Sequence, residues 1–224
     1  KTASHDIYGR LVGQLDRHLV LPLLDFLESR DKYSHDDVLQ AKVDLLGNGK
    51  TNMVTFVEGL KRELEGKADG EEVDGAQEFR QQEQQVVKTL NELQAEAQGV
   101  MNIISNPEVV AALRQDKLHN LAYLKEATEY AFLSLPMECV HVLMHNAQQL
   151  TLEQIELLYK FGQFQYSIGH YGGASDYLYH FRVLSTDSKL VLSAMWGKLA
   201  SDILEGSWDA ALEELNGLRD HIDQ

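Results

Sequence analysis

The chain has 224 residues, 44% of them hydrophobic and 25% charged, which is the composition of a soluble globular protein with one large domain or an elongated repeat array. Its 35 acidic residues outnumber 20 basic ones, and the net charge of −15 argues against a protein that wraps duplex nucleic acid with a basic face. One cysteine, Cys139, excludes a disulfide scaffold, and no apolar run is long enough to span a membrane. The single cysteine and the lack of an Asn-x-Ser/Thr acceptor indicate an intracellular protein, and because the chain opens at Lys1 without Met and ends in mid-pattern, we expect a fragment.

The first predicted element is an amphipathic helix. Apolar residues recur every four positions from Ile7 to Leu19 and continue after Pro22. Proline has no N–H to donate and clashes with the preceding turn, so we expect either a kink or a new helix start at Pro22.

Two further helices are predicted from their capping residues. Ser34 followed by Asp37 is a capping arrangement and predicts a helix to about Leu46, which the glycines that follow should end. Asn52 is placed to cap the next helix, and the apolar pattern carries that helix to about Glu65.

A loop and a long helix follow. Residues 66–75 contain three glycines and an excess of acid, which predicts a flexible loop. Over about 76–105 the apolar residues alternate in steps of three and four, with Glu83 interrupting the series, which predicts a long helix with a seam packed along another helix of this chain or of a second copy. The seam residues are Phe79, Val86, Leu90, Leu93, Ala97, Val100 and Ile104.

The region 151–224 contains an internal repeat with an offset of 37 residues. In each copy a helix ends at a glycine, a second helix begins within three residues, an aromatic side chain fills the corner, and an alanine lets the two helices approach closely. The two copies are Gly169-His-Tyr171-Gly-Gly-Ala174 and Gly206-Ser-Trp208-Asp-Ala-Ala211. We therefore predict an all-α fold, a tetratricopeptide-like solenoid of antiparallel helix pairs, with an irregular helical array over 1–150 and two hairpins over 151–224.

A phosphate-binding loop is considered and set aside. Gly47-Asn-Gly49-Lys50-Thr51 ends like a P-loop, but that motif needs a glycine at the position of Asp44, and no strand precedes it. An acidic side chain there would repel phosphate, so we expect an ordinary turn between helices.

The one metal-like cluster is Cys139-x-His141-x3-His145. Histidines four apart share a helix face and could hold zinc, but the cysteine two positions earlier points away and no fourth ligand is near. The sequences that surround catalytic cysteines are also absent. We predict no bound metal, no cofactor and no catalytic residue.

A partner-binding groove is predicted on the first helix of each hairpin. In the tetratricopeptide register Tyr159, Gln163, Tyr166 and Trp196 lie toward the concave side, where peptides bind in that class, although such aromatics can equally be core residues. The same helix face carries Glu156 and no Lys or Arg, which weakens the alternative of a free adaptor that clamps acidic peptide tails.

The last predicted helix carries more apolar positions than one neighbouring helix should cover. A terminal repeat needs a polar outer face, and this one lacks it. We expect part of the stripe, above all Leu218 and Ile222, to be exposed or covered by a second copy. The stripe is Trp208, Leu212, Leu215, Leu218 and Ile222.

Several segments carry a family resemblance. They are DRHLVLPLLDFL at 16–27, TNMV at 51–54, LNELQAE at 90–96, YKFGQFQYSIGHYGGASDYLYHFRVL at 159–184, and WGKLASDIL at 196–204 followed by WDAA at 208–211. Together they resemble the N-terminal half of the E subunit of eukaryotic translation initiation factor 3, which is of the PCI type. The chain departs from that pattern at 66–80 and around 134–150.

The resemblance implies a non-enzymatic scaffold in a cytoplasmic assembly that helps to recruit the small ribosomal subunit and messenger RNA. It implies helical repeats that lead to a PCI module with a winged helix beyond this chain. The implied partners are other subunits of the factor and other initiation factors, with no membrane and no sequence-specific contact to nucleic acid. The alternative within the same architecture is a PCI subunit of the proteasome lid or signalosome.

Overall fold

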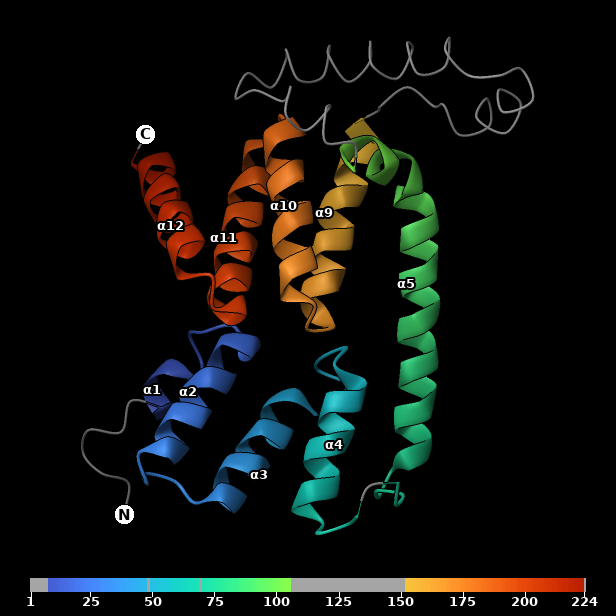
Figure 1. Cartoon of the computed structure of the whole chain (residues 1–224), viewed down its shortest axis with the longest axis vertical. Coiled ribbons are helices and arrows are strands. Elements are labelled where there is room, and N and C mark those ends of the chain that lie inside the picture. The colour runs from blue at the N-terminus through green and yellow to red at the C-terminus, as the bar shows by residue number, and fades with distance from the viewer. Residues whose placement is uncertain (1–7, 48, 69, 106–151, 224) are drawn as a thin grey trace. The chain divides into compact units, whose positions relative to one another are not determined.

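The computed structural model describes residues 8–47, 49–68, 70–105 and 152–223, and these form helices joined by turns (Figure 1). The helices are α1 (Tyr8–Leu11), α2 (Arg17–Ser29), α3 (His35–Leu46), α4 (Val54–Leu64), α5 (Ala76–Ile104), α9 (Leu152–Ser167), α10 (Tyr171–Leu184), α11 (Ser188–Glu205) and α12 (Trp208–Ile222). The predicted all-α class is confirmed, with helices packed in adjacent pairs as in a helical solenoid. Within the described ranges, no helix combines the length and apolar character that crossing a bilayer requires.

The contacts divide the chain into two units. The first contains the residues up to Lys88 together with Ser167–Gly169, and the second contains Thr89 to Tyr166 and the residues from His170 onward. This boundary falls inside α5. The division that we predict at residue 150 follows the repeat pattern instead and stays a prediction.

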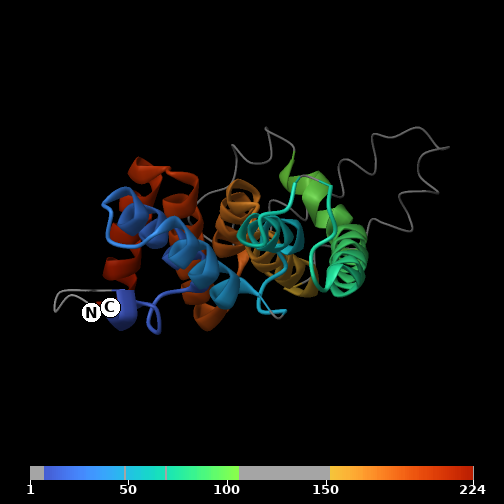
Figure 2. The same ribbon diagram turned by 90° about the horizontal axis from the view of Figure 1, so that it is seen from below.

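The first unit is built on α2, α3 and α4, which lie side by side in sequence order (Figures 1 and 2). The side chain of Asp16 caps α2 by accepting from the His18 N–H at 2.9 Å. Pro22 lies inside this helix, so the new helix start considered there does not occur. Two small apolar clusters hold the three helices together. Their buried members are Val20, Leu24 and Val38 in one cluster and Leu21, Leu46 and Val57 in the other.

Helix α3 begins and ends as predicted. Ser34 Oγ accepts from the Asp37 N–H at 3.2 Å, and the helix ends at Gly47. A Cβ at Gly47 would lie 2.5 Å from the Val43 carbonyl oxygen, so only glycine fits that close approach.

The predicted cap of α4 by Asn52 is wrong. Met53 occupies the N-cap position and makes no side-chain cap bond. Asn52 Nδ2 instead donates to Ser167 Oγ at 2.9 Å, and Thr51 Oγ1 accepts from the Met53 N–H at 3.2 Å. The amide of Asn52 therefore serves a contact 115 residues away in sequence rather than the nearest helix end.

The long helix predicted over about 76–105 is α5. Its seam packs within the chain: Phe79 lies against a cluster of the first unit, while Ala97, Val100 and Ile104 are buried in the core of the second. Ahead of α5, the basic side chains at the end of α4 bind carbonyl groups of the 66–75 loop. Lys61 Nζ, for example, donates to the Asp74 carbonyl at 2.6 Å.

The two predicted hairpins lie in the second unit except for Ser167–Gly169 at the first corner, which belong to the first unit, and both corners use the glycines as expected. Gly169 and Gly206 have φ of +86° and +78°, the left-handed conformation that glycine adopts without strain. Ala174 and Ala211 are buried, with 0% and 6% of their surface exposed. The prediction that an aromatic side chain fills each corner is wrong for the second corner, because Trp208 is 67% exposed.

Leu178 of α10 is enclosed by glycines of both neighbouring helices. A Cβ at Gly162 of α9 would lie 3.0 Å from Cγ and Cδ2 of Leu178, and a Cβ at Gly197 of α11 would lie 2.9 Å from its Cδ1. The absence of side chains at these two glycines lets α9 and α11 approach the leucine from opposite sides. Leu178 is 2% exposed and lies in the core with Phe181.

Candidate interaction surface

Two residues of the predicted groove, Tyr159 and Gln163, lie one turn apart on α9 and are bonded to each other. Gln163 Nε2 donates to Tyr159 Oη at 2.7 Å, and the same hydroxyl lies 2.7 Å from Oγ of Ser193 on α11. The ring of Tyr159 packs on Phe181 in the core, with 5.1 Å between the centroids. Core packing and bonds to two side chains hold this tyrosine in one orientation.

Trp196 is 53% exposed and follows Ser193 by three residues on α11, so its side chain leaves the helix on the same side. Tyr166 has a different role, because its ring packs edge-on against Tyr171 at the corner between α9 and α10, with centroids 5.6 Å apart. We call the surface formed by Tyr159, Gln163, Ser193 and Trp196 the aromatic face. Ser193 is a member that the sequence analysis missed, although its 34-residue offset from Tyr159 is close to the repeat period.

A network of buried charges joins α10, α11 and α12, and the sequence analysis missed it. Arg182 Nη1 donates to Glu214 Oε1 at 2.5 Å, and Lys198 Nζ donates to Asp202 Oδ2 at 2.6 Å. Lys198 also lies 3.7 Å from Glu214 Oε2, and Ser175 Oγ donates to Asp202 Oδ1 at 2.6 Å. Asp202 and Glu214 have side chains only 5% and 4% exposed.

This network fixes how the three helices align. Each buried carboxylate has a cation from another position, and removal of one partner would leave a charge unpaired away from water. The alignment of helices that pairs Arg182 with Glu214 therefore has a lower free energy than one in which α12 is shifted by one turn. Of the four charged residues, only Lys198 and Asp202 have the i,i+4 spacing that a sequence pattern can reveal.

Helix α12 exposes an apolar stripe. Leu212 is 59% exposed and Ile222 is 57% exposed, and Leu215 and Trp208 are exposed as well. Exposure of Ile222 agrees with the prediction, but the same prediction for Leu218 is wrong, because Leu218 is 1% exposed. Leu218 follows the buried Ala211 by two turns and so faces the same way, into the core of the second unit.

The segment that ends like a P-loop makes bonds within the first unit. Lys50 Nζ donates to the Asp44 carbonyl at 2.7 Å, and Thr51 Oγ1 donates to the Ser167 carbonyl at 3.2 Å. Lys50 borders a cleft of about 660 Å³ whose lining also includes Asp37 and Asp44. Carboxylates in the lining oppose a phosphate, which supports the interpretation of this segment as a turn between helices.

The predicted metal-like cluster of Cys139, His141 and His145 lies outside the described residues. Within the described ranges, no three His, Cys, Asp or Glu side chains are arranged to hold a metal ion.

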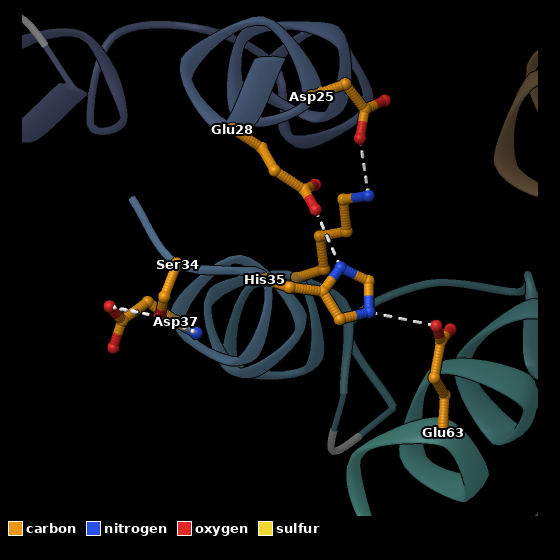
Figure 3. A network of polar contacts seen from close by, with 7 residues as sticks. Asp25, Glu28, Ser34, His35, Asp37 and Glu63 are labelled. Atoms are coloured by element: carbon orange, nitrogen blue, oxygen red, sulfur yellow. Dashed lines mark hydrogen bonds and ion pairs between the residues drawn. The ribbon is translucent and has the colours of Figure 1, made fainter. Parts of the chain in front are cut away.

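Polar contacts between α2, α3 and α4 form an exposed network in the first unit (Figure 3). His35 lies between two carboxylates, with Nδ1 2.6 Å from Glu28 Oε1 and Nε2 3.0 Å from Glu63 Oε1. Lys42 Nζ donates to Asp25 Oδ1 at 2.5 Å and ties α3 to α2 a second time. Glu28 and, to a smaller extent, Glu63 accept hydrogen bonds from the ring, and these bonds raise the pKa of His35 above 6.5.

Paired antiparallel helices and a core continuous from one hairpin to the next define a helical-repeat protein. The family described as "eIF3 subunit 6 N terminal domain" matches residues 6–145. The chain therefore belongs to this family, the N-terminal domain of a subunit of eukaryotic translation initiation factor 3.

Similar proteins come from distant eukaryotes. The protein named as the E subunit of eukaryotic translation initiation factor 3 in Schizosaccharomyces pombe is 42% identical over 98% of this chain and 39% of its own length. The proteins with the same name from Yarrowia lipolytica and Arabidopsis thaliana are 42% and 37% identical over 98% of this chain, which corresponds to 45% and 44% of their lengths. The chain thus spans less than half the length of these relatives.

Proposed function

We propose that the chain is a non-enzymatic scaffold segment of a translation initiation factor 3 complex and that it works in the cytoplasm. The observation that carries this proposal is the 42% identity over 98% of the chain to a protein named as the E subunit of that factor. Its partners are other subunits of the factor and other initiation factors. Through the complex it helps to recruit the small ribosomal subunit and messenger RNA, and its charge of −15 favours contacts with proteins over contacts with phosphate.

The proposal extends to the part of the protein that this chain does not span. The relatives are more than twice as long as the stretch they share with the chain. We place there the PCI module with its winged helix, through which such subunits associate. The helical pairs described above would then serve as an additional set of binding faces.

Within the chain, the aromatic face is the surface that we propose to contact a partner. Tyr159 and Trp196 supply the large aromatic area that dominates protein interfaces, and Gln163 and Ser193 supply hydrogen-bonding groups beside it. Because Tyr159 is already held in place, binding would not have to order its side chain, which lowers the entropic cost of association.

The experiment is an affinity capture from a eukaryotic lysate with the tagged chain, read by quantitative mass spectrometry. The proposal expects subunits of initiation factor 3 and proteins of the small ribosomal subunit to be enriched. Enrichment of proteasome-lid or signalosome subunits instead would favour that alternative and contradict the proposal.

A matched pair of tryptophan variants tests the surface. Trp196→Ala should lose at least part of the enriched set, while Trp208→Ala should retain it, because Trp208 lies on α12 and is at least as exposed. Both side chains are surface residues, so both variants should melt close to the parent. Equal capture by the two variants would contradict the assignment of the aromatic face but not the membership of the complex.

A further inference from the structure

His35 is the first residue of α3 and contacts carboxylates on both neighbouring helices (Figure 3). Its Nδ1 faces Glu28 of α2 and its Nε2 faces Glu63 of α4, at 2.6 and 3.0 Å. A neutral imidazole carries one N–H, so it can donate to one of these carboxylates and presents a lone pair to the other. Both contacts are attractive only when the ring carries two protons and a positive charge.

We propose that His35, Glu28 and Glu63 form a proton-dependent latch that joins α2, α3 and α4 and opens when His35 loses a proton. The protonated ring gives two charge-assisted hydrogen bonds to two different helices. The neutral ring keeps one of them and places its second nitrogen, as an acceptor, against an ionised carboxylate. One helix is then released.

The charges around the ring favour its protonated form. Glu28 and Glu63 are the two carboxylates in contact with the ring, and they raise the pKa of His35 above 6.5. The nearby cations are engaged elsewhere: Lys42 pairs with Asp25, and Arg62 pairs with Glu58 at 2.7 Å. The positive end of α3 opposes protonation, and the acids in its first turn offset that effect. The charged groups on the three packed elements are Arg17, Asp25 and Glu28 on α2 with Arg30 just after it, Asp36, Asp37, Lys42 and Asp44 on α3, and Glu58, Lys61, Arg62 and Glu63 on α4.

The packing indicates which segment the latch controls. Val57, in the first turns of α4, is buried against Leu21 and Leu46, so that end of the helix stays fixed when the latch opens. Glu63 lies at the other end, and the neighbouring Lys61 and Arg62 bind carbonyl groups of the 66–75 loop. Opening the latch therefore frees the last turn of α4, while Val73 of the loop is buried and keeps that part of the chain in place.

The first measurement is the pKa of His35 in the whole chain, from the pH dependence of its ring Cε1–Hε1 resonance, assigned with His35→Gln. We expect a pKa above 6.5 in the parent and a lower pKa in Glu28→Gln and in Glu63→Gln. Glu213→Gln, an exposed acid on α12, is the matched control and should leave the pKa unchanged. A parent pKa at or below 6.5, or one that neither glutamate variant lowers, would overturn the proposal.

The second measurement tests the opening. Amide exchange of α4 and of the 66–75 loop is followed at pH 6 and pH 8, with each rate divided by its intrinsic value at that pH. The latch predicts that protection of the last turn of α4 falls several-fold at pH 8 in the parent, whereas His35→Gln has the low value at both pH values. Equal protection of this turn at the two pH values in the parent would overturn the proposal even if the pKa is raised.

Discussion

The close approach of α9 and α11 to Leu178 predicts an unusual response to alanine at two helical glycines. Gly162→Ala would place a methyl group 3.0 Å from two carbons of Leu178 and 3.4 Å from Cβ of Tyr177. Gly197→Ala would place one 2.9 Å from the opposite methyl of the same leucine. Real Cβ atoms seldom come so near to another carbon, so Leu178 or a helix must move in either variant.

Two opposing effects set the magnitude. Alanine favours a helix over glycine by about 1 kcal/mol, and an added methyl group in a packed core costs about 1–3 kcal/mol. Each single variant should therefore lose up to about 2 kcal/mol of unfolding free energy. In the double variant Leu178 cannot move away from one new methyl without meeting the other, so the loss should exceed the sum of the singles by about 1 kcal/mol.

The assay is urea unfolding followed by tryptophan fluorescence, because the only two tryptophans, Trp196 and Trp208, both lie in the second unit. Gly217→Ala on α12 is the control. Its new methyl would meet only Met195 Cε at an ordinary 3.8 Å, so this variant should gain up to about 1 kcal/mol. Stabilisation by Gly162→Ala equal to that of the control, or strict additivity of the two glycine variants, would refute the packing argument.

Three further predictions concern charge, the two sides of α12 and pH. Glu214→Gln should lower the free energy of unfolding by about 3 kcal/mol in the same assay. This is the lower end of the range for a broken buried ion pair, because the partner Arg182 can still reach water. A loss below about 1 kcal/mol would contradict the network. On the exposed side of α12, Leu212→Lys should change the free energy of unfolding by less than about 0.5 kcal/mol. On the buried side, Leu218→Lys should lower it by about 4 kcal/mol or more. Similar losses in both variants would contradict this assignment of the two sides. Burial lowers the pKa of His18 below 6.5, so the unfolded chain binds a proton more readily and stability should fall as pH drops below 6.5. His18→Gln should weaken this fall in thermal melts between pH 7 and pH 5, and an unchanged pH profile would contradict it.

Local sequence signals were sufficient where one residue and its immediate neighbours decide the structure. Ser34 caps α3 because a serine just before a helix can accept a hydrogen bond from a backbone N–H of the first turn that has no other partner within the helix. Gly169 and Gly206 adopt left-handed conformations because the corners require them, and the small residues five positions later are buried. These features follow from spacing alone.

The failures share a different cause. Asn52 lies where a cap is expected, but its amide bonds to Ser167, and no local pattern reveals a partner 115 residues away. Leu218 and Ile222 differ in exposure although both belong to one apolar stripe, because burial depends on how α12 is rotated against its neighbours. Arg182 pairs with Glu214 across 32 residues for the same reason. Tertiary contacts, rather than the pattern within each helix, determined these positions.

The buried charges of α10, α11 and α12 and the exposed contacts around His35 both align helices, with different consequences. The charges of Asp202 and Glu214 are almost removed from water, so salt screens them little and the alignment of α10, α11 and α12 is insensitive to the surroundings. The ring of His35 and the carboxylate of Glu63 are both more than half exposed, and exposed ion pairs hold helices weakly and respond to salt and pH. A repeat that presents a fixed aromatic face requires the first kind of network. A helix end that is to be released requires the second, so among the described helices we expect the end of α4 to change its position at a smaller cost in free energy than the hairpins.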